Sequence, residues 1–278
     1  MEENPDVVFA YTSLTPGVEI PAYFADILER LGIPQDGLME IESPTCFEEL
    51  YVPDECFLSD PQDSFKTFTK EYIEVIQKLI DSCAEVEIRT YDRIYFSREK
   101  IQDGKDIGEN RLSEVFKQLG YQIIFPEYLS LDQQIWLLQH CSFFAATEGS
   151  VAHNAIFMRN GANVVLLRKA NYCNTFQVAI NKARQLNVTY IDVNKSNVLP
   201  HDVRICWGPF FLYQSRELSR FAGVKPVPFP VGSYVKYAAN YYANSTFVHN
   251  LKHIPNLIMR KVLGAKNYSA LKRILKKR

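Results

Sequence analysis

Five apolar segments decide the fold of this chain: IYFS (94–97), YQIIF (121–125), SFFAA (142–146), NVVLL (163–167) and VTYIDV (188–193). Each has the length and composition of a buried strand, and helical spacing lies between them. Such an alternation predicts a parallel sheet with helices packed on its faces. We therefore expect an α/β fold with a Rossmann-like sheet, whose ligands would bind beyond the carboxyl ends of the strands.

Four helices are predicted between and beside these strands. Three cover residues 109–119, 150–158 and 174–186, and the fourth begins at Leu129-Ser130. The helix that begins at Leu129-Ser130 has the clearest amino-terminal signal, because Ser130 and Gln133 have the spacing of a capping box. The helix over 150–158 begins in the polar cluster Thr147-Glu148-Gly149-Ser150, directly after the strand SFFAA. A turn there would point backbone N–H groups at a bound anion.

We expect three parts in the chain: a short α/β part over 1–90, the Rossmann-like domain over 91–200 and an extension over 201–278. The first part is predicted to hold a buried strand, a helix, two short strands and a long helix, over 6–14, 21–31, 38–41, 50–52 and 65–83. It has too few strands for a complete doubly wound domain. Prolines 226, 228 and 230 indicate an extended linker in the last part.

Composition excludes several classes of protein. No apolar run approaches the roughly 20 residues that span a bilayer, and the acidic start is unlike a signal peptide. The six cysteines are scattered, which favours free thiols in a reducing cytosol. The five histidines have no metal-ligand spacing, so we expect no structural zinc.

Charge is distributed very unevenly along the chain. Residues 1–63 contain fifteen acidic residues against Arg30 alone, and no acidic residue follows Glu217. Residues 254–278 have helical spacing with a wholly basic polar face. Two interpretations stay open: this tail lies on an anionic membrane, or it packs back on the acidic amino-terminal part.

Two sets of residues could carry chemistry. Arg98 and Lys100 follow the first strand of the sheet, where Arg98 could bind a phosphate or carboxylate and Lys100 could add charge. The alternative is a solvated charge run. In the second set, Gly149 allows a tight turn, Ser150 begins a helix, and Glu148 could accept hydrogen bonds from sugar hydroxyls.

His153 and Asn154 lie on the first turns of that helix, and His153 could equally be a packed core histidine. The cluster matches neither Gly-x-Gly-x-x-Gly nor Gly-x-x-x-x-Gly-Lys-Ser/Thr, which argues against a dinucleotide or an ordinary ATP site. It also lacks the second glycine of a serine-hydrolase nucleophile elbow.

An ordered set of short motifs resembles the family 61 glycosyltransferases from about Leu31 to Val193. The similar segments are Ile94-Tyr95-Phe96-Ser97-Arg98, Glu109, Gln134-Ile135, Thr147-Glu148-Gly149-Ser150, Asn154-Ala155-Ile156-Phe157-Met158 and Gly161. Two positions depart from the family pattern. Gly108 stands where the family has Asn, and Glu148 stands where it has His.

The resemblance implies a GT-B-like fold and an inverting glycosyltransferase that uses a nucleotide sugar, usually UDP-linked, without a metal or other cofactor. Arg98 would neutralise the diphosphate, Gly149 and Ser150 would cradle it, and Asn154 would support the turn. Glu148 would bind the ribose or the donor sugar. The catalytic base is unassigned, and Asp26 and Glu48 are candidates only because they lie in the acceptor half.

We accordingly expect a cytoplasmic hexosyl- or pentosyltransferase of cell-surface polysaccharide synthesis, acting on a glycan or glycolipid and peripheral to a membrane through 254–278. Other functions remain open: a catalytically degenerate nucleotide- or glycan-binding protein, or a nucleotide-sugar epimerase or hydrolase. No nucleic-acid partner is expected, because the basic tail lacks interleaved aromatic residues. Whether the protein forms a homo-oligomer is left open.

Overall fold

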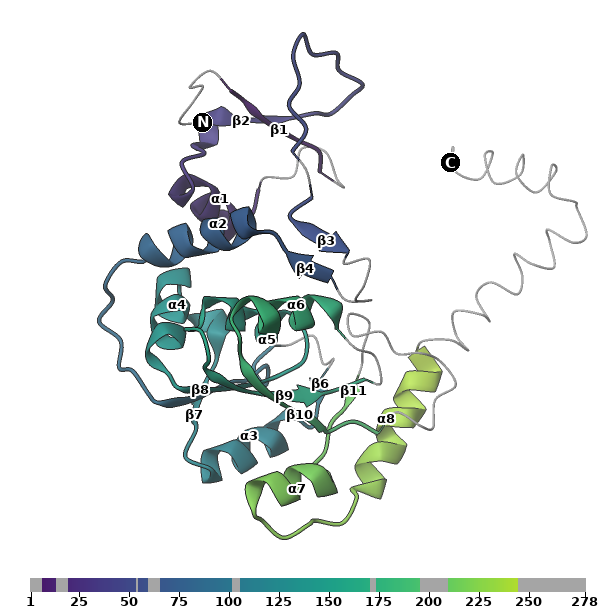
Figure 1. Ribbon diagram of the computed structural model, residues 1–278. Coiled ribbons are helices and arrows are strands. Elements are labelled where there is room, and N and C mark those ends of the chain that lie inside the picture. Colours follow the sequence, from purple (N-terminus) through teal and green to yellow (C-terminus); the bar gives the residue numbers. More distant parts are fainter. Residues whose placement is uncertain are drawn as a thin grey trace, which may run out of the picture.

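A computed structural model describes residues 7–13, 20–53, 55–59, 66–101, 106–170, 174–195 and 210–244 (Figure 1). Its centre is a sheet of five parallel strands in the order β10–β9–β8–β5–β7. The strands are β5 (Arg93–Phe96), β7 (Gln122–Ile124), β8 (Phe143–Thr147), β9 (Asn163–Arg168) and β10 (Asn187–Asp192). The predicted Rossmann-like α/β sheet is therefore confirmed, strand by strand.

Helices cover both faces of this sheet, because successive strand residues point to opposite faces. Ile94 and Phe96 pack with α2 (Lys70–Asp81), α4 (Leu131–His140) and α6 (Thr175–Ala183). Tyr95, between them, packs on the other face with α3 (Glu109–Gln118) and α7 (Arg216–Ala222). The result is three layers with the sheet in the middle (Figure 1).

The strand order reverses direction at β5. From β5 the chain first adds β7 on one side, and then crosses to the other side to add β8, β9 and β10 in turn. The crevice outside the carboxyl ends of β5 and β8 is thus a topological switch point, which is where open α/β sheets bind ligands.

The amino-terminal part differs from its prediction in three places. The strand expected over 6–14 is only β1 (Phe9–Tyr11), which is not buried, since Phe9 is 45% exposed. Residues 50–52, expected as a strand, are exposed and belong to no strand. The helix expected over 65–83 begins only at Lys70, because Lys66–Phe68 form β4, which pairs with β3 (Phe57–Ser59), and Thr69 caps the helix.

Two other predicted elements of this part, the helix over 21–31 and the strand over 38–41, are confirmed. Helix α1 (Ala22–Arg30) lies between β1 and β2 (Leu38–Glu40), which pair in parallel. Two α2 side chains, Ile76 and Leu79, share the core of the central sheet. The proposed division at residue 90 stays a prediction.

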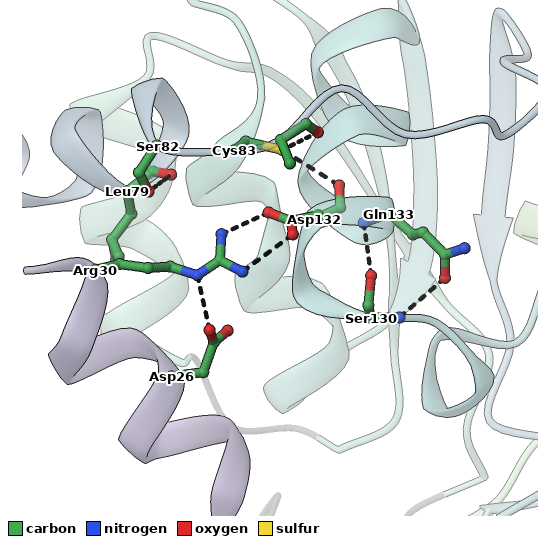
Figure 2. Close-up of polar contacts among 9 residues, drawn as sticks. Asp26, Arg30, Leu79, Ser82, Cys83, Ser130, Asp132 and Gln133 are labelled. Carbon is green, nitrogen blue, oxygen red and sulfur yellow. Dashed lines mark hydrogen bonds and ion pairs between the residues drawn. The ribbon is translucent and has the colours of Figure 1, made fainter. Parts of the chain in front are cut away.

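A single arginine joins α1 to α4 (Figure 2). Both terminal nitrogens of Arg30 bind the Asp132 carboxylate, with Nη2–Oδ2 at 3.0 Å, and its Nε binds Asp26 Oδ1 at 3.0 Å. Arg30 holds the pKa of Asp132 below its usual range. The predicted capping box is also present, since Ser130 and Gln133 bind each other's backbone N–H. This arginine contact, which we call the Arg30 clamp, fixes α1 against the sheet's helical layer.

The carboxyl-terminal part contains structure that the sequence did not predict. The strand β11 (Phe210–Phe211) pairs in parallel with β6 (Asp106–Ile107), and α7 and α8 (Val231–Asn244) follow. Phe211 packs with Tyr234 and Tyr237 of α8. The proposed tail helix over 254–278 lies outside the described residues. Within the described ranges, no helix has both the length and the apolar content needed to cross a bilayer.

Candidate functional site

Three charged residues follow neighbouring strands at the carboxyl edge of the sheet. Arg98 follows β5, Glu148 follows β8 and Lys169 follows β9, and these strands are neighbours. Arg98 and Glu148 were expected here from the sequence, and Lys169 was missed. Lys169 obeys the same rule, since it directly follows the strand NVVLLR.

Asp106 connects the two cations. Its carboxylate accepts from Arg98 Nε at 2.8 Å and from Lys169 Nζ at 3.0 and 3.2 Å. The Lys169 and Asp106 side chains are 4% and 5% exposed, and that of Arg98 is 16% exposed. Lys169 also lies 4.8 Å from the centre of the Phe210 ring. We call Arg98, Asp106 and Lys169 the charged triad; it carries a net positive charge within the protein.

Residues of the family motifs are hydrogen-bond partners behind this triad. The Tyr95 hydroxyl donates to Glu109 Oε1 at 2.6 Å, and the Arg98 backbone N–H donates to the same oxygen at 3.5 Å. Ser97 Oγ accepts from the Glu99 N–H, which turns the chain after β5. These bonds fix the start of the segment that carries Arg98. They explain why Tyr95, Ser97, Arg98 and Glu109 occur together in the motifs.

Gly149 forms the turn after β8 with φ 128° and ψ −164°, a conformation available essentially only to glycine. A side chain there would point at Lys169, because a Cβ would lie 3.5 Å from its Nζ. The predicted helix over 150–158 is wrong in detail: α5 spans only Ser150–His153, and a 3₁₀ turn covers Asn154–Phe157. Ser150 is exposed, and Gly149 rather than Ser150 occupies the N-cap position.

Glu148 is 2% exposed, and its Oε2 has no hydrogen-bond partner among the described residues. The hydroxyl of the neighbouring Thr147 has none either. Burial raises the pKa of Glu148 to about 7, against the opposing effect of Arg168 and Lys169. A buried carboxyl with an unused oxygen at a switch point is suited to accept hydrogen bonds from a ligand.

Stability should fall as the pH rises toward neutrality. Burial raises the pKa of both Glu148 and Glu109 to about 7, above the unfolded value of about 4.3. The folded state therefore binds more protons between these values, so the free energy of unfolding decreases from about pH 4.3 to 7, by roughly 1–3 kcal/mol per carboxyl. Urea unfolding at pH 5 and 8 should show a smaller difference in Glu148→Gln than in the wild type. An unchanged difference would contradict a raised pKa, and Glu127→Gln, at an exposed position, is the control.

Three other predicted site residues, Lys100, His153 and Asn154, have their described contacts outside the charged triad. Lys100 is exposed, with its Nζ 5.7 Å from the centre of the Phe125 ring. His153 Nε2 lies 2.9 Å from the Asn174 amide nitrogen, and burial lowers the pKa of His153. Because Asn174 Oδ1 already caps α6, its nitrogen must donate to a neutral His153. Asn154 contacts Gln134 of α4 at 3.5 Å.

Neither candidate for the catalytic base, Asp26 or Glu48, has a described contact with residues at the carboxyl edge of the sheet. Asp26 is paired with Arg30 in the clamp (Figure 2), and Glu48 is exposed in a segment without helix or strand. Among the described residues, no group of three or more His, Cys, Asp or Glu side chains is arranged to hold a metal ion.

Comparison with known proteins identifies one family. The model of the glycosyltransferase 61 family matches residues 20–165, more than half of the chain. This range contains β5, α3, α4 and β8, and with them Arg98, Asp106, Glu109 and Glu148. No curated protein matches the chain.

Proposed function

Because the chain belongs to the glycosyltransferase 61 family, we propose that it transfers a sugar from a UDP-linked donor to a glycan hydroxyl, with inversion and without a metal. The family makes it a glycosyltransferase; the donor, the stereochemistry and the hexosyl or pentosyl class are our proposal. The observation that supports it best is the charged triad beside the Gly149 turn at the switch point.

In this proposal Arg98 and Lys169 bind the diphosphate. Phosphate oxygens would share the two cations with Asp106 or replace it, and the guanidinium can bind two of them at once. As the bond to the sugar breaks, negative charge develops on the diphosphate. Fixed cations in a water-poor site stabilise that charge in the transition state, which is the role that a metal ion plays in other transferases.

Glu148 would bind the hydroxyls of the ribose or the donor sugar through its unused oxygen. Its raised pKa means that it is only partly ionised near neutral pH, so it can either accept or donate a hydrogen bond. The base that deprotonates the acceptor is not assigned to a residue. Membrane contact through residues 254–278, and with it a peripheral location for synthesis of a cell-surface glycan, stays a prediction about residues outside the described ranges.

A thermal-shift panel with UDP, GDP, CMP and their common sugars, with and without EDTA, tests the proposal. A ligand that binds only the folded state raises the midpoint of unfolding. We expect the largest shift with UDP and UDP-sugars, unchanged by EDTA. A shift that EDTA abolishes would contradict metal independence, and no shift with any nucleotide would favour a degenerate glycan-binding protein.

A further inference from the structure

A second site is built at the carboxyl end of β10. A groove of about 620 Å³ lies between this strand end, the start of α7 and residues 226–229, and its lining includes Asn194, Tyr213, Gln214 and Phe229. A second groove of about 430 Å³ reaches α3 and shares Tyr213, Gln214, Val227 and Pro228 with the first. Because the two grooves share these four lining residues, we call them together the β10 trough.

The walls of the β10 trough are held by the fold. The Tyr213 N–H donates to the Val193 carbonyl at 2.9 Å, which continues β10 into the trough. The Tyr213 and Phe229 rings pack edge to face, with centroids 4.9 Å apart. Both rings are only half-buried, so they present apolar surface that a ligand can cover.

Planar polar groups stand beside these rings. The Gln214 amide nitrogen donates to Ser219 Oγ at 3.1 Å and to the Lys225 carbonyl at 3.3 Å. Asn194 uses its amide nitrogen on the Arg168 carbonyl at 3.0 Å. Each amide is thereby oriented, and the oxygen is the atom that it can still offer to a hydroxyl.

The charges that line the trough balance. Asp192 and Glu217 oppose Lys195 and Arg216, so the lining of the larger groove has no net charge. A phosphate-bearing ligand would favour an excess of cations, as in the charged triad. Aromatic surface, oriented amides and balanced charge together fit a neutral polyhydroxylated ligand, whose C–H faces pack on rings and whose hydroxyls bond to amides and carboxylates.

We propose that the β10 trough binds a neutral oligosaccharide as the acceptor subsite of the transferase. The trough adjoins the donor site through Arg168. This side chain pairs with Asp192, in the lining of the trough, at 3.1 Å, and its positive charge also interacts electrostatically with Glu148. An acceptor could therefore place one hydroxyl near Glu148 while further sugar units occupy the trough. The assignment as acceptor subsite rests on the proposed function; the binding of glycan does not.

Saturation-transfer NMR on the full chain tests the proposal, with neutral di- to hexasaccharides of glucose, galactose, mannose, xylose and N-acetylhexosamine at millimolar concentration as probes. Val227 is 49% exposed and lines both grooves, so Val227→Arg should obstruct the trough without disturbing the core. The matched control is Val235→Arg on α8, at a residue 58% exposed and outside the lining. Midpoints of thermal unfolding confirm that both variants fold.

We expect at least one oligosaccharide to bind the wild type and Val235→Arg, with at least a tenfold weaker signal in Val227→Arg and an unchanged UDP-induced thermal shift in all three. The proposal would be overturned if no oligosaccharide gave a saturation-transfer signal with the wild type, or if the signal were equal in the two variants. Loss of the UDP shift in Val227→Arg would show that the trough holds the nucleotide, and overturns it too. Glycan binding without any nucleotide shift would sink the proposed function and leave the trough as a glycan site.

Discussion

Lys169→Met should weaken UDP binding by about 10- to 100-fold, the loss expected for one charge-assisted hydrogen bond of roughly 1.5–3 kcal/mol. Its ammonium is buried between Asp106, the Phe210 ring and the Gly149 turn, and methionine keeps the length of the side chain without the charge. Breaking a buried ion pair also destabilises the fold. The measurement is therefore calorimetric titration with UDP well below the unfolding midpoint, beside Lys78→Met at an exposed position of α2.

Asp106→Asn should have the opposite effect on the same titration. Removing this carboxylate leaves Arg98 and Lys169 without their shared counter-ion, so an incoming diphosphate meets a site more positive by one charge. We expect several-fold tighter UDP binding. If Lys169→Met and Asp106→Asn weaken binding equally, the charged triad is a structural network and its assignment to the diphosphate is wrong.

Gly108→Ala should destabilise the protein by about 3–5 kcal/mol, combining backbone strain with overpacking. Gly108 has φ 102°, and a Cβ there would lie 2.2 Å from the Leu212 carbonyl oxygen. Leu212 directly follows β11, which pairs with β6. Neither Gly108 nor Leu212 can therefore move away from the other without disturbing the β6–β11 pairing that holds Asp106. Urea unfolding measures the loss.

Gly120→Ala separates the two causes. Gly120 also has a positive φ, 81°, but a Cβ there meets nothing within 4 Å, so only backbone strain of about 1–2 kcal/mol is expected. Gly108→Asn installs the residue that the family pattern has. It should still destabilise the protein by about 1–3 kcal/mol through overpacking, because asparagine tolerates the backbone angle but not the contact. Equal stability of Gly108→Asn and the wild type would show that the β6–β11 contact is not as tight as described.

The regular sheet could be predicted because each strand and helix there carries its own periodic signal. The segments from IYFS to VTYIDV became β5, β7, β8, β9 and β10 in order, and the Ser130 capping box formed as its spacing indicates. The short α5 could not be predicted, since an apolar run does not distinguish an α-helix from a 3₁₀ turn. The aromatic residues 207–213 and the prolines at 226, 228 and 230 interrupt the alternating pattern, so β11, α7 and α8 were missed.

The candidate site was predictable only where it follows the sheet. Arg98 and Glu148 were found because they come directly after strands, and Lys169 could have been found by the same rule. Asp106 could not, because it reaches the site through the pairing of Asp106 with Phe210, about a hundred residues later in the chain. No local pattern contains a contact of that separation, which is why the counter-ion of both cations was absent from the prediction.

The Arg30 clamp restricts how the protein can close around its substrates. Enzymes often enclose a reaction by swinging one layer of the molecule about a hinge. Here such a swing of α1 away from α4 would break the bidentate pair between Arg30 and Asp132, whose side chains are 19% and 17% exposed, at a cost of roughly 1–3 kcal/mol. A movement of α1 away from α4 on substrate binding is therefore opposed by this contact.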